Sequence, residues 1–241
     1  MNGKAILLIV AIAIFAFGFY LLLYPTLKTA VEDAKAQEII EAFQTYIDEE
    51  TAAAKAFPPA QETPADTQPF PALWEACQRY NETIYENRQR DLNAESMQTP
   101  ALSLSAYGYE SECFGYLSIP QADIEVPLFL GSSWSNLDRG AAILGQTSLP
   151  IGGKNTNCVI AGHRSWSGAI KFRSLEQLTT GDLVYLTNPW ETLTYEVIEA
   201  KIISPDDVDE ILIRDGCDRL SIFTCTNPNT RRFLVICQRK E

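Results

Sequence analysis

The sequence predicts a mainly β domain that follows N-terminal helices and one transmembrane helix. Seven short runs rich in β-branched and aromatic residues lie within residues 113–241, and Gly, Pro, Asn and Asp separate them. An uncharged apolar run and two stretches with apolar residues at helical spacing precede them. Strands this short and this numerous favour a closed all-β barrel or a β-sandwich.

The first element is the apolar run at residues 5–24, which carries no charge. About twenty such residues are enough to span a bilayer as a helix. Residues 1–4 form a tail with Lys4, the α-amino group and no acidic residue, so the positive-inside tendency places this tail in the cytoplasm. The run is longer than the core of a typical signal peptide, and no A-x-A cleavage motif follows it. We therefore expect a single-pass anchor in the cell membrane, with the rest of the chain extracellular.

Helical segments and a linker are expected next. Apolar residues within 25–51 recur at helical spacing and predict a juxtamembrane helix. Five prolines within 52–71 predict an extended linker. A second helix is predicted at 73–92, and a Ser-rich loop at 95–110.

The seven β-type runs give the expected strands. They lie at 114–120, 125–131, 158–163, 182–187, 192–203, 219–225 and 232–239. One short helix, at about 171–178, is expected to interrupt them.

Charge and residue counts exclude several classes of function. The chain has 19 Lys and Arg against 31 Asp and Glu, a net charge of −12, so it lacks the basic face that nucleic acids or anionic lipids require. The single histidine, His163, rules out zinc sites built on several histidines. None of the six cysteines forms a C-x-x-C motif. We expect no metal and no cofactor.

Three polar residues stand at the ends of predicted strands: His163, Cys225 and Arg232. Residues 226–231 are short enough for an antiparallel hairpin, which would bring Cys225 and Arg232 together, whereas spacing does not place His163. A thiolate is a nucleophile, an imidazole can exchange its proton, and a guanidinium can donate hydrogen bonds to an oxyanion. The combination indicates acyl transfer through a thioester.

These motifs resemble those of a known family. IFTCTN at 222–227, NTRRFLV at 229–235 and CVIAGHR at 158–164 resemble the Cys, Arg and His strand motifs of sortases. The segments 79–89 (RYNETIYENRQ) and 147–157 (TSLPIGGKNTN) resemble the class C, pilus-assembling branch, as do FGYLSIPQADIEVPLFLG and the YP after the apolar run.

The resemblance implies a fold and an activity. It implies an eight-stranded sortase-type β-barrel over residues 113–241, preceded at 72–112 by a helix and a lid-like loop. Sortases are membrane-bound cysteine transpeptidases of Gram-positive bacteria that cut an LPXTG-like sorting signal between Thr and Gly. They pass the acyl group to a pilin lysine or to a cell-wall precursor amine, for pilus assembly or surface-protein anchoring.

The resemblance also assigns roles at the site. Cys225 would form the thioester, and His163 would be the acid and base. Arg232 would position the signal and stabilise the oxyanion, helped by the backbone N–H after Cys225. The family pattern and strand alternation favour Arg232 over its neighbour Arg231.

Further candidates are less closely tied to the chemistry. Thr224, Thr226 and Trp166 are expected to bind substrate. The loop at 95–112 lacks the Asp of class C lids, so Tyr107 and Tyr109 are the candidates for covering the cleft. Two other tryptophans either line the peptide groove or simply pack, namely Trp134 and Trp190.

The same residues are compatible with two other functions. A plain cysteine peptidase would release the acyl group to water, and a non-catalytic, membrane-tethered module would only bind. Disulfides between Cys77 and Cys113 or between Cys217 and Cys237 are chemically possible outside the cell, but free thiols are favoured. The acidic run at 205–210 favours a solvated loop over a calcium site.

Overall fold

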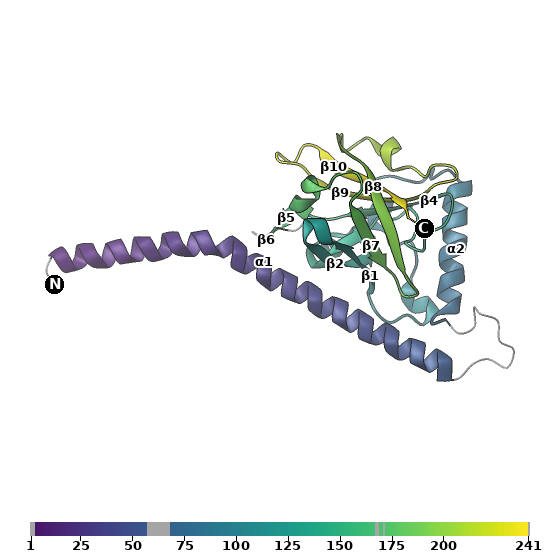
Figure 1. The fold of residues 1–241 in the computed structure, drawn as a ribbon, viewed down its shortest axis with the longest axis horizontal. Coiled ribbons are helices and arrows are strands. Elements are labelled where there is room, and N and C mark those ends of the chain that lie inside the picture. Colours follow the sequence, from purple (N-terminus) through teal and green to yellow (C-terminus); the bar gives the residue numbers. More distant parts are fainter. Residues whose placement is uncertain (1–2, 57–67, 167–168, 171, 241) are drawn as a thin grey trace.

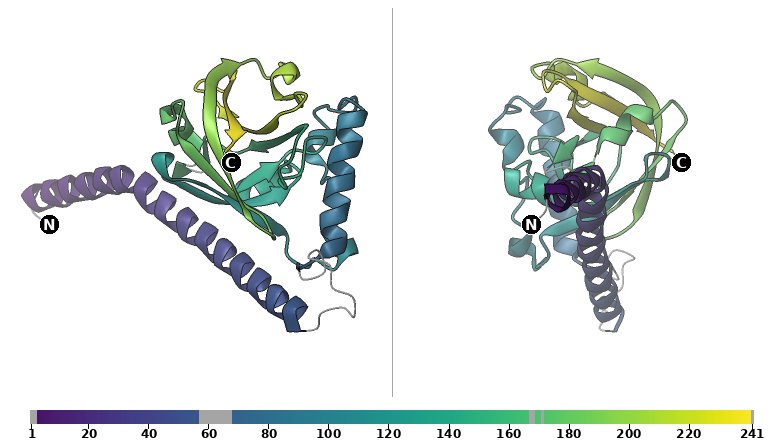
Figure 2. Two further views of the ribbon diagram at one scale, coloured as in Figure 1. Left: turned by 45° about the vertical axis from the view of Figure 1, so that its right-hand side comes forward. Right: turned by 90° about the vertical axis from the view of Figure 1, so that its left-hand side faces the viewer.

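The computed structural model describes residues 3–56, 68–166, 169–170 and 172–240. A long helix, α1, projects at its N-terminal end and packs with its second half against a β-barrel, while a second helix, α2, stands beside the barrel (Figures 1 and 2). The predicted mainly β domain behind N-terminal helices is confirmed.

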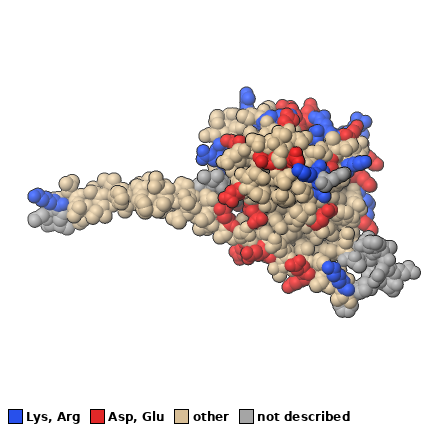
Figure 3. Space-filling view, viewed as in Figure 1, with Lys and Arg blue, Asp and Glu red and all other residues tan. Residues whose placement is uncertain are grey.

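Helix α1, Gly3–Ala56, runs without interruption through Pro25. The predicted segments 5–24 and 25–51 are therefore parts of one helix. Its N-terminal half is long and apolar enough to cross a membrane, with a mean hydropathy of 3.0, and its side chains are exposed. Figure 3 shows this half free of charged residues beyond its tip.

The second half of α1 is amphipathic and belongs to the folded body. Ala36, Ile40 and Phe43 are buried, and Phe43 lies in a cluster with Cys113 and Phe129 of the barrel. Burying a side chain of this size stabilises the contact by roughly 1.5–3 kcal/mol. The juxtamembrane helix is thus a structural part of the domain.

The predicted linker at 52–71 is divided by the structure. Residues 52–56 complete α1, whereas 57–67 lie outside the described residues. Helix α2, Pro71–Glu86, begins at a proline, which suits the first turn because the N–H there has no helical partner. It ends at Glu86 rather than at 92.

The early end of α2 has a local cause. Arg88 and Gln89 take left-handed backbone angles, with φ of 52° and 49°, which stop a helix. The Gln89 side chain is buried, donates to the carbonyl of Gln146 and accepts from the N–H of Ile213. These long-range contacts could not be read from helical spacing.

Several short helices connect the strands. They are η1 (Ser96–Gln98), η2 (Leu104–Tyr107), η3 (Pro120–Ala122), α3 (Trp134–Arg139), η4 (Phe172–Gln177) and η5 (Val208–Ile211). The expected short helix at 171–178 corresponds to η4, and Lys171 lies outside the described residues. The others are too short to show a helical period in the sequence.

Eight strands close into a barrel rather than a sandwich. In spatial order they are β1 (Cys113–Ile119), β2 (Ile124–Leu130), β3 (Ala141–Ile143), β4 (Thr156–Ala161), β9 (Asp218–Cys225), β10 (Arg232–Arg239), β8 (Thr192–Ile203) and β7 (Leu183–Thr187). A separate hairpin pairs β5 (Ser165–Trp166) with β6 (Ala169–Ile170). All seven predicted strands are present, and three-residue β3 completes the eight.

Alternate residues of β4 face opposite sides of the barrel wall. Cys158 and Ile160 belong to the main core inside the barrel, whereas Val159 and Ala161 belong to a second cluster on its outer face. We call this second cluster the outer cluster. Its buried members are Leu144, Val159, Ala161, Ile203, Ile211, Leu234 and Ile236, and Leu92, Met97, Leu137 and Phe223 pack against it.

All six cysteines are free thiols. Cys77, Cys113, Cys158 and Cys237 are buried, and Cys217 and Cys225 are half-buried. Neither of the two disulfides considered above is formed.

Candidate active site at three strand ends

The β9–β10 hairpin brings two of the candidate residues together. Arg232 is the register partner of Cys225 in this antiparallel pair. The loop is closed by a hydrogen bond of 3.0 Å from the Thr226 N–H to the Arg231 carbonyl. Directly opposed residues of antiparallel strands point to the same face, so the thiol and the guanidinium share one side of the sheet.

His163 joins them through the parallel pairing of β4 with β9. Ala161 is the partner of Phe223, so continuing this register by two residues brings His163 level with Cys225. The Gly162 N–H donates to the Phe223 carbonyl at 3.2 Å, which carries the pairing past the end of β4. The hairpin alone could not predict this placement, because it depends on a long-range strand pair.

The three residues also share a face by alternation. On β4, β9 and β10 the residues Ala161, Phe223 and Leu234 all lie on the outer cluster, and each is two positions from a candidate residue. His163, Cys225 and Arg232 therefore stand together at one end of the outer cluster. A thiol, an imidazole and a guanidinium thus meet beside an apolar surface.

Burial at the site is intermediate. The His163 side chain is 16% exposed, and Cys225 and Arg232 are half-buried. A substrate can reach such groups, while the partial exclusion of water strengthens charge interactions between them. Arg231 is exposed and lies just before the strand, which agrees with the choice of Arg232.

The helix α3 adds two residues that were not predicted to act together. The Trp134 ring lies over the His163 imidazole, with centroids 5.7 Å apart and an angle of 31° between the planes. The Asp138 Oδ1 atom is 3.7 Å from His163 Nε2. The only sequence signal for α3 is Ser133, whose side chain accepts the N–H of Asn136 as a helix cap.

Thr224 does not lie on the face that the predicted substrate contact requires. It is 1% exposed, and its hydroxyl donates to the Gly162 carbonyl at 2.8 Å. It therefore ties β9 to the chain just before His163. Alternation explains the error, because Thr224 faces the opposite side of the sheet from Cys225.

Thr226 organises the hairpin loop. Its hydroxyl donates to the Pro228 carbonyl at 2.8 Å. Its N–H, the one after Cys225, already donates to the Arg231 carbonyl. This N–H would be available to an oxyanion only if that hydrogen bond breaks, so its predicted role stays a prediction.

The predicted cleft aromatics lie elsewhere. Tyr109 is 1% exposed within the main core, packs against Phe70 and Tyr46, and donates to the Cys113 carbonyl at 2.7 Å. Tyr107 also packs against the main core. Tyr109 is thus a core residue rather than a cleft cover, and Tyr107 contacts the main core rather than the outer cluster.

The structure shows the packing of one of the two remaining tryptophans, Trp190, but not that of Trp166. Trp190 packs edge-on against Trp74 at 4.9 Å, and its indole N–H donates to the Pro69 carbonyl, so it is a packing residue. Trp166 belongs to β5, but its side chain lies outside the described part of the chain.

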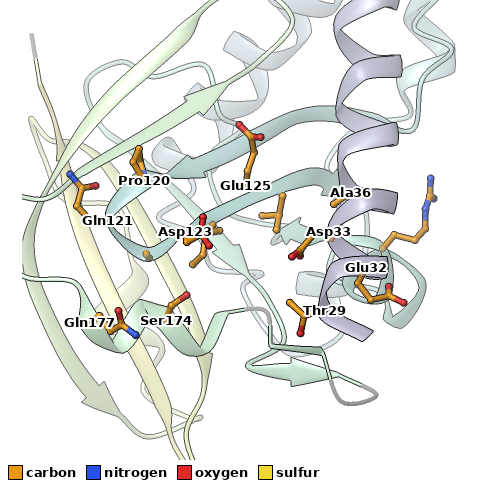
Figure 4. A pocket seen from close by; sticks show the side chains of 15 residues that line it. Thr29, Glu32, Asp33, Ala36, Pro120, Gln121, Asp123, Glu125, Ser174 and Gln177 are labelled. Carbon is orange, nitrogen blue, oxygen red and sulfur yellow. The ribbon is translucent and has the colours of Figure 1, made fainter. Parts of the chain in front are cut away.

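One cavity of about 400 Å³ lies between α1 and the turn before β2, lined by acidic and polar side chains such as Asp33, Asp123 and Glu125 (Figure 4). None of the three strand-end residues lines it. Within the described ranges, no group of three or more His, Cys, Asp or Glu side chains is arranged to hold a metal ion. In the acidic run, Glu210 pairs with Lys201 at 2.6 Å.

The barrel matches a known protein family. Residues 117–240 match the sortase domain, and this match covers more than half of the chain. The chain belongs to the sortase family. The strand ends that carry His163, Cys225 and Arg232 all lie within or next to strands of this matched region.

Among individual relatives, the chain is similar to sortases named A and C. Sortase A of Streptococcus agalactiae serotype III (strain NEM316) is 28% identical over 139 residues, and this match spans 56% of either chain. The solved sortase C1 of GBS pilus island 1 is 27% identical with a TM-score of 0.67, covering 86% of this chain and 92% of that one. Sortase C from Clostridium perfringens SM101 is 26% identical with a TM-score of 0.63, covering 84% and 98%. The predicted sortase-type barrel is thereby confirmed.

Proposed function

We propose that this sortase is a membrane-anchored cysteine transpeptidase that cleaves an LPXTG-like sorting signal and transfers the acyl group to an amine. The observation that carries the proposal is the register of β4, β9 and β10, which aligns His163, Cys225 and Arg232 on one face. Sortase family membership gives the reaction class to which such a set belongs.

In the first half-reaction the Cys225 sulfur bonds to the carbonyl carbon of the Thr residue in the signal. His163 takes the proton of the Cys225 thiol and gives it to the departing amine as the Thr–Gly amide bond breaks. Arg232 donates hydrogen bonds to the oxygen that becomes negative in the transition state. Such a donor typically contributes about 2.7–4 kcal/mol to lowering the barrier.

In the second half-reaction an amine attacks the thioester carbonyl. The C–S bond breaks, and His163 accepts the proton of the attacking amine and passes it to the Cys225 sulfur, which regenerates the thiol. The acceptor amine is a pilin lysine or a lipid-linked cell-wall precursor. The likeness to sortase C1 of GBS pilus island 1 favours the pilin lysine and a role in pilus assembly.

The outer cluster supplies a binding surface for the signal. It begins beside the three strand-end residues, and its partly buried members Phe223 and Leu137 leave apolar area open to solvent. The Leu and Pro of an LPXTG-like signal are apolar and would remove this area from water at roughly 25 cal/mol per Å². The signal therefore lies along β9, with its Thr at Cys225.

The loop before β1 borders this surface at residues 92–97. Leu92 and Met97 pack against the outer cluster. The Met97 carbonyl accepts from the N–H groups of Ser132 and Gly145 and from the Ser132 hydroxyl, at 2.9–3.1 Å. A segment fastened in this way forms a wall of the groove, and it would act as a lid only after these hydrogen bonds break.

The membrane anchor is the N-terminal half of α1. We infer a single pass with the N-terminus in the cytoplasm and the barrel outside, because Lys4 precedes the apolar run without any acidic residue. The second half of α1 packs on β1 and β2, which keeps the barrel close to the membrane surface. Surface proteins or pilins that emerge from the membrane would meet the site there.

The test is a product assay with the full chain in detergent, an LPXTG-type peptide and an added primary amine. We expect the amine-capped LPXT product and released Gly peptide. LPXT acid in place of the capped product would instead assign a cysteine peptidase. Peptide binding without any cleavage, over a panel of signals, would assign a binding module.

A further inference from the structure

The helix α3 lies against the catalytic imidazole, although it belongs to the connection between β2 and β3. Two of its residues, Trp134 and Asp138, are four positions apart and therefore lie on the same face of the helix. Both contact His163, one over the face of the ring and the other at Nε2. We propose that Asp138 is a positioning residue for His163 and that Trp134 holds the plane of the imidazole. This inference rests on the proposed transpeptidase function.

The helix is held firmly enough to position a neighbour. At its start, the Asn136 side chain donates to the carbonyls of Leu130 and Gly131 at 3.0 and 2.9 Å, which ties α3 to the end of β2. At its end, Arg139 pairs with Glu112 at 2.6 Å and stacks over the Phe129 ring at 4.5 Å. A short helix fastened at both ends keeps Asp138 at a fixed place beside the imidazole.

The contact has a defined chemical effect. A carboxylate beside Nε2 favours the tautomer that carries its hydrogen on Nε2, which leaves Nδ1 to exchange protons with the Cys225 thiol and the amines. It also stabilises the imidazolium that forms during the reaction. At 3.7 Å the contact is electrostatic rather than a hydrogen bond, and the Asp138 side chain is 43% exposed, so the effect is moderate.

The other charged groups around His163 have different roles. Arg164, the next residue, is paired with Glu176 of η4 at 3.0 Å. Cys225 and Arg232 stand at the neighbouring strand ends and take part in the reaction. Asp138 is the carboxylate paired with the imidazole in the described part of the chain.

The indole of Trp134 has a mechanical role. It is 66% exposed, yet one part of it covers the imidazole face. A large side chain that stays exposed in a short helix gains little from burial. Its contact with His163 restricts rotation of the imidazole about the Cβ–Cγ bond and so holds the plane of the ring.

The first arm of the test is kinetic and uses the full chain in detergent. Asp138→Asn keeps the shape and removes the charge, and we expect kcat to fall about tenfold with the KM for the peptide unchanged. Asp138→Glu should recover part of the loss. The matched control is Glu112→Gln, which removes an exposed carboxylate near the same helix and leaves Arg139 stacked on the Phe129 ring. It should stay within about twofold of the wild type.

The second arm uses the fact that the protein has a single histidine. With ¹³C-labelled histidine, NMR follows the titration of one imidazole without overlap. We expect the midpoint to move to lower pH in Asp138→Asn and to stay in place in Glu112→Gln. Trp134→Ala should change the chemical shift of the imidazole, because it removes the ring current of the indole.

An unchanged midpoint in Asp138→Asn overturns the proposal, even if activity falls. A shifted midpoint with unchanged kcat also overturns it, since the contact would then not serve catalysis. If the wild type transfers no acyl group with any signal, the proposed function fails. The NMR arm then still decides whether Asp138 acts on His163.

Discussion

Arg232 lies directly opposite Cys225 in the antiparallel pair of β9 and β10. The guanidinium therefore rises from the same face of the sheet as the thiol. Its neighbour Arg231 is exposed and contributes its carbonyl to the hairpin loop. Register thus distinguishes two adjacent arginines that composition alone cannot separate.

We expect Arg232→Ala to lower kcat by about 10²–10³, because it removes a donor to the oxyanion. Arg231→Ala is the matched control and should retain most of the activity. The measurement is the rate of peptide transfer to an amine, with thermal unfolding to verify that both variants are folded. Equal losses in the two variants would contradict the assignment.

The six thiols differ in burial and are therefore expected to differ in their reactivity toward alkylating reagents. Burial raises the pKa of the Cys113 thiol to about 11 and that of Cys77 to about 12. A raised pKa leaves little thiolate at pH 8, and the same burial excludes the reagent. Iodoacetamide at pH 8 should therefore modify the half-buried Cys217 and Cys225 and spare these two, as read by peptide mass mapping. Rapid modification of Cys77 or Cys113 in the folded protein would contradict this burial.

Tyr109 should be important for stability and not for catalysis. Its buried hydroxyl donates to the Cys113 carbonyl at 2.7 Å, so Tyr109→Phe leaves that carbonyl without this donor. We expect a loss of about 1 kcal/mol in the free energy of unfolding, measured by denaturant titration. Peptide KM and kcat should not change. A rise in activity would instead restore the role of a cleft cover.

Met97 tests whether the segment before β1 is a wall or a lid. As part of a wall, its side chain gives the signal peptide an apolar contact, so Met97→Ala should raise the peptide KM by about three- to tenfold. The neighbouring Gln98 is exposed, and Gln98→Ala is the control. A lower KM or a faster reaction in Met97→Ala would indicate that the segment covers the groove in the resting enzyme.

The sequence predicted elements whose signal is local. The seven β-type runs, the hairpin between Cys225 and Arg232 and the apolar helix all depend on residues close in the chain. The lengths of α1 and α2 were predicted less well. Pro25 does not break α1, and α2 ends where Gln89 binds two distant backbone groups.

At the site, the parts that spacing along the chain could not place are long-range, and His163 was assigned there only through the resemblance to sortases. His163 reaches Cys225 through the parallel β4–β9 pair, whose register cannot be read from either strand alone. Asp138 and Trp134 reach His163 from a six-residue helix with no visible period. Thr224 is the exception, because strand alternation already places it on the face opposite to Cys225. Strand alternation can be read from the sequence, and it decides which face Thr224 occupies even though Thr224 is next to Cys225 in the chain.

The acyl-enzyme is the species that most directly tests whether Cys225 is the nucleophile of a transpeptidase. Full-length wild type and Cys225→Ala would be incubated with an LPXTG-type peptide and analysed by intact mass, before and after addition of a primary amine. We expect an LPXT adduct on the wild type alone, which disappears as the amine-capped peptide forms. An adduct on Cys225→Ala, or amine-capped product made by that variant, would show that the chemistry does not pass through this thiol.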